Sequence, residues 1–341
     1  MLNTWFINRQ GNVVNYELVR DYEIKSDYLT GDLSKFVVTQ YQTIKKGMFV
    51  ISKYASQGNV AFFGVVKSVD NSTINCGEIF TTADFEITTT SKSGNSFEAH
   101  VISLINKYLI NDPSKEANII EITKLTDTPH VYQPSDPPTA RNLTSYLING
   151  FKKYNIVWKF VEWDGKKIKT TIERIDRSLQ IKDNGNSFAN WEYYSSSLAD
   201  VNKLLIVDKA TNDMENIGLF ATYYLTSDNE ITTNWQDARV IKPTQEKVFF
   251  YDNAAEDKPS YIDVANSELK GNVYSHEIEF DLYKDSTLID FENLEIGTLF
   301  NIYRGSELFQ SVLTGYSFSS GSSFVHLTFG NIRSRLSEIL E

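Results

Sequence analysis

The chain has 341 residues, 41% of them hydrophobic, and is therefore long enough to form two or three domains with sizeable cores. Its 44 acidic and 33 basic residues give a formal net charge of −11. This charge argues against a nucleic-acid-binding surface, which needs positive charge to displace counterions. The single cysteine, Cys76, excludes an internal disulfide and fits folding in a reducing cytoplasm.

Residues 1–92 are predicted to form an N-terminal β-barrel. Short strand candidates rich in aromatic and β-branched residues follow one another with turn signals between them, a pattern typical of barrels and sandwiches. Three of these strands form the first cassette: 47–53, 60–69 and 72–77. Gly47 opens the first strand of this cassette, and Gly64 lies inside the second, which indicates a bulge or a barrel corner.

Residues 93–270 are predicted to form a central α+β region that begins with two helices. The first is expected after a loop at 91–95, because Asn95 and Glu98 have capping-box spacing and the following apolar residues keep a 3.6-residue period. The second is expected to begin at Asp136, after a proline-rich loop, with apolar residues along one side.

The rest of the central region is predicted to be mostly strands. Strands 156–163 and 167–174 should form a hairpin around Asp164–Gly165, a dipeptide typical of tight turns. A strand near 202–225 could return to the first barrel, and a short helix is expected at 259–269.

Residues 271–332 are predicted to form a second β-barrel, followed by a short C-terminal helix at 333–341. This barrel holds a second cassette: 297–304, 308–317 and 324–330. Gly297 opens its first strand as Gly47 does in the first cassette, and Gly315 lies inside the second strand as Gly64 does.

The matching glycines indicate one small module used twice. We therefore predict a mainly β fold with an α+β insert, in which two small antiparallel β-barrels are related by duplication. The residues assigned to this frame are Gly47, Gly64, Gly297 and Gly315. The duplication matters because three copies of a chain with two equivalent barrels have approximate sixfold symmetry.

Patterns that carry chemistry are scarce. The four histidines have no partner at i+4, and Cys76 lacks the signatures of a catalytic cysteine, so we expect a small buried thiol there. The acidic groups at 208–215 and 252–257 are more typical of solvated loops than of paired catalytic carboxylates. The stretch 183–187 matches only part of a calcium loop. We predict no catalytic residue, no metal ligand and no cofactor.

Two aromatic groups have two interpretations. Trp158 with Trp163, and Trp191 with Tyr193 and Tyr194, could form a sugar-binding platform, or could pack in a core or a subunit interface. Packing is the better interpretation. The first residues lack the layout of a signal peptide, and no apolar run approaches the ~18 residues of a membrane span.

Four stretches carry a resemblance to a known family. They are YLTSDNEITT at 224–233, RVIKP at 239–243, YIDVANSEL at 261–269 and FVHLTFGNIRSRL at 324–336. They resemble the baseplate hub, or tail-associated, proteins of long-tailed phages and prophages of Gram-positive bacteria, which have the fold of the contractile-phage central hub. The resemblance extends along essentially the whole chain in the order of its elements.

This resemblance implies a non-enzymatic virion protein at the phage tail tip, made in the bacterial cytoplasm. It implies a trimeric ring that connects the sixfold tail tube to threefold tip components and surrounds the DNA channel. The implied partners are the distal tail protein, the tape-measure protein and a receptor-binding fibre or spike, while DNA passes without specific binding. An acidic channel wall would help DNA to pass because it repels phosphate.

Three other functions stay open from the sequence. The chain could be a receptor- or carbohydrate-binding module of the tail tip, a tail-associated cell-wall hydrolase, or a secretion-system spike component. Many family members carry a long C-terminal extension for host binding or wall cleavage, and this sequence stops at Glu341. We therefore expect those two activities to belong to other proteins.

Overall fold

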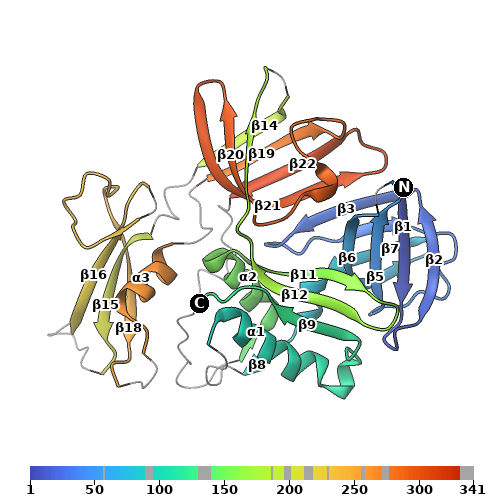
Figure 1. The fold of residues 1–341 in the computed structure, drawn as a ribbon, viewed down its shortest axis with the longest axis horizontal. Helices are drawn as coiled ribbons and strands as arrows, with labels where there is room; N and C mark the ends of the chain where they lie inside the picture. Colours follow the sequence, from blue (N-terminus) through green and yellow to red (C-terminus); the bar gives the residue numbers. More distant parts are fainter. Residues whose placement is uncertain are drawn as a thin grey trace.

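A computed structural model describes residues 1–56, 58–88, 95–129, 140–185, 187–195, 201–210, 218–228, 230–254, 258–270 and 276–330. The described chain is mainly β, as predicted, and its largest sheet has 13 strands. Figure 1 shows two β modules side by side, a central layer of helices and strands beneath them, and a small α/β unit at one end. In the described part of the chain, no helix is long and apolar enough to span a bilayer.

The N-terminal β module is built from the first seven strands. They are β1 (Leu2–Ile7), β2 (Val13–Val19), β3 (Asp21–Asp27), β4 (Ser34–Val37), β5 (Phe49–Tyr54), β6 (Val60–Asp70) and β7 (Thr73–Glu78). β5 and the first half of β6 are buried on both faces, which is why they read as continuous apolar runs.

The C-terminal β module takes strands from two parts of the sequence. They are β13 (Ser178–Lys182), β14 (Ala189–Ser195), β19 (His276–Tyr283), β20 (Leu299–Arg304), β21 (Glu307–Ser319) and β22 (Phe324–Gly330). β13 pairs with β20, and β14 pairs with β19. Residues 178–195 therefore contribute to this module, although they lie within the predicted central region.

The central layer lies against both modules. Its strands are β8 (Glu86–Thr88), β9 (Ile120–Lys124), β10 (Ala140–Asn142), β11 (Ile156–Trp163) and β12 (Ile168–Arg174), and its helices are α1 (Phe97–Ile105), extended by a π-helical turn at Asn106–Ile110, and α2 (Leu143–Tyr154). The hairpin around Asp164–Gly165 is confirmed. The N-cap of α1 is Ser96, whose side chain accepts from Ala99 N, so the cap predicted at Asn95 is one residue too early.

The small unit has a sheet and a core of its own. It consists of β15 (Val201–Asp208), β16 (Leu219–Leu225), β17 (Ile231–Thr232), β18 (Gln245–Tyr251) and α3 (Tyr261–Leu269), which covers one face of the sheet. β15 and β16 pair with β17 and β18, so they do not return to the first module as we had considered. Lys153 of α2 and Lys247 both pair with the buried Glu268, which ties the small unit to the central layer.

The two β modules have the same order of strands. The order is β3–β4–β7–β6–β5–β1 in the N-terminal module and β14–β19–β22–β21–β20–β13 in the C-terminal one. They differ at the last pair, which is antiparallel for β1–β5 and parallel for β13–β20. The described pairings form an open path from β14 to β2, so neither module is a closed barrel in this part of the chain.

The cassettes match in detail at their first turn. Gly47 and Gly297 have φ of +89° and +91°, and each is the third residue of a turn closed by a 3.2 Å backbone hydrogen bond. A type II turn needs positive φ at this position, which is why glycine stands there. Each glycine N–H then donates at 2.8 Å to the second strand, at Val66 and Leu313 respectively. In both cassettes the pairing of the second and third strands is irregular directly after that residue.

The other pair of frame glycines does not match. Gly64 lies opposite Val50, whereas Gly315 lies beyond the irregularity. The paired registers instead align Gly64 with Ser311 and Gly315 with Ser68. The predicted equivalence of Gly64 and Gly315 is therefore wrong, because the spacing of glycines cannot distinguish a bulge from a close backbone approach.

Candidate functional site

The two β modules are joined by pairing between β21 and β3. The registers run from Gly315 opposite Asp27 to Ser319 opposite Glu23. Beyond the last pair, Ser320 N donates to the Tyr22 carbonyl at 2.9 Å, and the Tyr22 ring meets the Phe318 ring edge-on at 6.2 Å. The second half of β21 is thus paired on both sides, with β22 and with β3.

The corresponding strand edges elsewhere are unpaired among the described residues. β14 takes the place in its module that β3 takes in the other, yet β14 pairs only with β19 among the described strands. Its Tyr193 and Tyr194 are 46% and 48% exposed, whereas Ile24 of β3, which corresponds to Tyr193, is fully buried. Likewise the second half of β6 pairs only with β7. Exposed edges of this kind are the sites where another strand can add.

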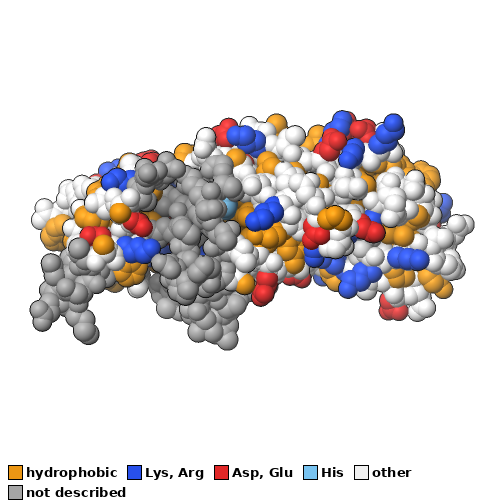
Figure 2. Space-filling model, turned by 90° about the horizontal axis from the view of Figure 1, so that it is seen from below, with side chains coloured by type: hydrophobic (Ala, Val, Ile, Leu, Met, Phe, Trp, Pro, Cys, Tyr) orange, Lys and Arg blue, Asp and Glu red, His pale blue; other side chains and the backbone are white. Residues whose placement is uncertain are grey.

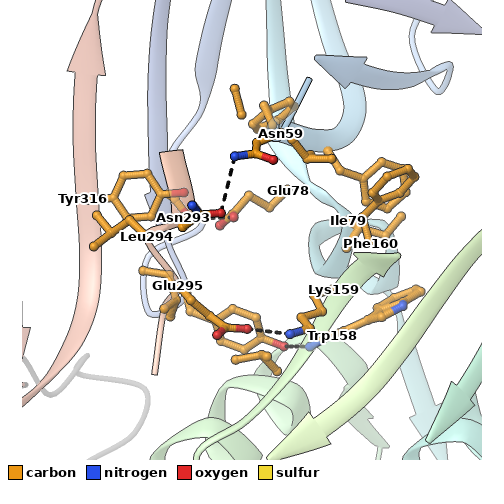
Figure 3. A pocket seen from close by; sticks show the side chains of 18 of the residues that line it. Asn59, Glu78, Ile79, Trp158, Lys159, Phe160, Asn293, Leu294, Glu295 and Tyr316 are labelled. Atoms are coloured by element: carbon orange, nitrogen blue, oxygen red, sulfur yellow. Dashed lines mark hydrogen bonds and ion pairs between the residues drawn. The ribbon is translucent and has the colours of Figure 1, made fainter. Parts of the chain in front are cut away.

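A cavity of about 430 Å³ lies beneath the β21–β3 junction. Residues of both β modules and of β11 line it, including Glu78, Trp158, Lys159, Glu295 and Tyr316. Figure 3 shows Glu78 extending from the N-terminal module toward Asn293 of the C-terminal one, with Lys159 and Glu295 facing each other on the opposite side. The Nδ2 of Asn59 donates to Asn293 Oδ1 at 3.4 Å between the two modules.

Glu78 is the most perturbed acid of this cavity. Its Oε1 accepts a 2.7 Å hydrogen bond from Ser26, and its Oε2 is buried with no hydrogen-bond partner among the described residues. Burial raises the pKa of the Glu78 carboxyl to about 7; the neighbouring Asp27 carboxylate adds to the rise, and hydrogen bonds from Ser26 and the Asp27 backbone oppose it.

Lys159 is the main cation of the cavity. Its Nζ pairs with Glu295 at 2.5 Å and also with Glu173. Burial lowers the pKa of Lys159, but the hydrogen bonds to Glu173 and Glu295 outweigh it, so the pKa of Lys159 lies above its ordinary value. This ion-pair cluster connects the central hairpin to the turn that precedes β20.

The other residues considered from the sequence lie in separate parts of the chain, and several of them fall outside the described residues. In the described part of the chain, no three His, Cys, Asp or Glu side chains gather as a metal site. Cys76 is a buried thiol, as predicted, and burial raises its pKa. Asp183 Oδ1 accepts from the amides of Gly185 and Ser187, which is a turn. His130, Asp213, Glu215, Glu256, Asp257 and the helix predicted at 333–341 lie outside the described residues.

The aromatic groups do not form one exposed platform. Trp158 is 3% exposed and belongs to the core. The Trp191 ring stacks on Phe280 at 5.4 Å, and the guanidinium of Arg304 lies 4.5 Å from its centre. On the face seen from below, basic and acidic side chains are interspersed, and neither forms one continuous patch (Figure 2).

The frame glycines have different steric roles. A Cβ at Gly64 would lie 2.0 Å from the Gly77 carbonyl oxygen, which is a clash, whereas a Cβ at Gly315 would meet the Ser26 carbonyl oxygen at 3.4 Å.

The sequence analysis did not identify Glu78, Lys159 or the exposed edge of β14. The only signal for Glu78 was an acidic residue at the end of a strand whose Ile74 and Cys76 alternate with polar residues.

Comparisons with known proteins identify the fold. No protein-family model matches the chain, and no curated protein is similar to it in sequence. A tail protein from Neisseria meningitidis MC58 is similar in structure with a TM-score of 0.53 and 8% identity, over 97% of both chains. The prophage tail protein gp18 from Listeria monocytogenes EGD-e has a TM-score of 0.52 and 11% identity, over 99% of this chain and 97% of that one.

A chain of the p2 virion baseplate in its activated conformation gives a third match, with a TM-score of 0.51 and 11% identity, over 98% of this chain and 100% of that one. These likenesses cover nearly the full length of each protein. The chain therefore has the fold of phage tail and baseplate proteins.

Proposed function

We propose that this chain is a structural hub subunit of a phage or prophage tail tip. Three copies form a ring in which two β modules per chain give six similar positions. Such a ring connects the sixfold tail tube, through a distal tail protein, to threefold tip components such as a fibre or spike. The full-length likeness to tail and baseplate proteins supports this proposal, and so does the common strand order of the modules.

The β21–β3 contact is the observation on which the ring rests. Repeating this contact between chains pairs the second half of β6 in one copy with β14 of the next. A repeated contact that closes on itself satisfies both unpaired edges, which would otherwise favour aggregation. The exposed Tyr193 of β14 becomes buried on assembly, as its counterpart Ile24 in β3 already is, and Tyr194 takes the place of the half-buried Lys25.

The channel inside the ring carries DNA and the tape-measure protein without binding DNA specifically. The net charge of −11 supports this role, since an acidic wall repels phosphate. A lumen that proved neutral or basic in the assembled ring would remove this part of the proposal.

Cysteine cross-linking tests the ring contact directly. Lys25 lies opposite Ser317 within the chain, and the registers give Tyr194 and Asp70 as the corresponding pair between chains. Directly opposed residues on antiparallel strands are close enough for a disulfide. We expect Asp70→Cys/Tyr194→Cys, mixed with the distal tail protein and oxidised, to give a covalent species of three times the 39.0 kDa chain mass.

The matched control is Lys25→Cys/Ser317→Cys, which should close within one chain and leave the mass unchanged. Val13→Cys/Tyr194→Cys, which joins β14 to the outer strand β2, should not cross-link. If the Asp70 and Tyr194 cysteines stay reduced in assembled complexes, while the internal control oxidises, the proposed contact is wrong.

A tail-associated hydrolase is the second candidate, favoured by one observation. Glu78, Glu292 and Glu295 line the same cavity, and a carboxyl with a pKa of about 7 can act as a general acid. It ranks second because Glu295 is paired with Lys159. If the wild-type protein lowers the turbidity of a cell-wall suspension and Glu78→Gln does not, the hydrolase becomes the better proposal.

A further inference from the structure

The junction cavity contains buried polar atoms that the protein itself does not satisfy. Glu78 Oε2, Glu292 Oε2 and Trp158 Nε1 are buried and make no hydrogen bond to any described residue. All three residues line the cavity. Buried polar groups are usually paired, because an unmade hydrogen bond costs free energy. The cavity therefore has room for a ligand and groups that would bind one.

The charges of the cavity favour a cation. Glu78 and Glu292 form no ion pair among the described residues, and Glu295 shares Lys159 with Glu173. Arg177, the other cation of the lining, donates to the Asn293 carbonyl at 2.9 Å. Carboxylates therefore exceed cations here, and a further positive charge would be stabilised.

The walls of the cavity suit a carbon chain and an ammonium group. The ring centroids of Tyr28 and Phe80 lie 4.3 Å apart, and those of Phe63 and Phe160 lie 4.8 Å apart. Together with Trp158 they give the cavity an aromatic wall. Aromatic faces attract cations, and most strongly when water is excluded.

We propose that this cavity binds an alkylammonium group, which donates to Glu78 and Glu292 while its carbon stem packs on the aromatic wall. A free diamine and the end of a lysine side chain from a partner protein present the same chemistry. The proposal does not rest on the ring, because the cavity lies within one chain.

Binding should depend on pH through Glu78, since only the carboxylate attracts a cation. The groups around Glu78 are Asp27 at the end of β3, Tyr28 directly after it, Tyr316 of β21, Lys159 of β11, and Arg177, Glu292 and Glu295. Because burial raises the pKa of Glu78 to about 7, it is mostly protonated in the empty cavity below neutral pH and mostly ionised at pH 8. A bound cation favours ionisation, so binding releases a proton.

Calorimetric titration with butylammonium chloride tests the proposal, with neutral 1-butanol as the matched probe. At pH 8 we expect saturable binding of butylammonium, weakened about tenfold or more at pH 5.5 and in Glu78→Gln. Glu307→Gln, a change on the exposed start of β21, should bind as the wild type does. Near-ultraviolet circular dichroism verifies that both variants are folded.

Three results would overturn the proposal: equal binding of butanol, undiminished binding by folded Glu78→Gln, or no saturable binding at millimolar concentration. A short peptide with an internal lysine distinguishes the sources. Binding of the peptide indicates a partner side chain, and binding of butylammonium alone indicates a free amine. The ring is tested separately, by the mass of the cross-linked species. If the ring proposal proves wrong, the result of the binding test is unaffected.

Discussion

Replacing Glu78 with glutamine is expected to remove a pH-dependent loss of stability. The pKa of this carboxyl rises from 4.5 to about 7 on folding, because burial disfavours the charged form. The stability that comes from holding the proton is fully present below pH 4.5 and is lost as the pH rises through 7. At 1.36 kcal/mol per pKa unit, the full loss is about 3 kcal/mol.

Urea unfolding of the wild type and of Glu78→Gln at pH 5, 6, 7 and 8 measures this effect. We expect the variant to gain stability relative to the wild type steadily across this range, with most of the gain complete by pH 8. The glutamine amide can change the free energy of unfolding by a constant amount at every pH. This amount cancels, because the test compares only how the difference in unfolding free energy between variant and wild type changes with pH. A difference that stays flat between pH 5 and pH 8 would refute the assigned burial of this charge.

Other changes test the frame and the cores. Gly64→Ala should destabilise the chain by about 3 kcal/mol or more through its clash with the Gly77 carbonyl, whereas Gly315→Ala should cost about 1 kcal/mol or less; equal effects in thermal unfolding would contradict this. Phe300→Ala should cost about 3–5 kcal/mol by chemical denaturation because the side chain is fully buried, and a cost below 1 kcal/mol would be inconsistent with that position. Lys159→Met should lower the free energy of unfolding by about 1–2 kcal/mol, because Glu295 and Glu173 lose their ion-pair partner. The loss is modest because Lys159 is partly exposed, and an unchanged urea midpoint would show that the ion pairs contribute nothing to stability.

The cavity and the junction above it have related roles. The β21–β3 pairing fixes the two modules side by side, and the Lys159 ion pairs fix the central hairpin beneath them. A cation bound at Glu78 would stabilise this arrangement by binding the folded chain in preference to the unfolded one. The rigidity of one chain would then depend on the ligand, whereas assembly of the proposed ring would depend on the strand edges.

The sequence by itself determined the local elements of this protein. The Asp164–Gly165 hairpin depends on backbone preferences of a few adjacent residues, so it could be predicted, and Gly47 and Gly297 marked the start of a strand for the same local reason. The mainly β character follows from aromatic and β-branched strands in the same way.

Only the tertiary structure decided which strands meet and which charges are buried. β13 and β14 join a module whose other strands come about a hundred residues later, because pairing depends on edges that the chain brings together after long connections. Both modules have an irregularity at the same place in the second strand, and Gly64 lies before it whereas Gly315 lies directly after it, which the spacing of the glycines in the sequence does not show. Glu78 looks like any strand-end acid in the sequence, and its pKa changes only because three parts of the fold close around it and exclude water.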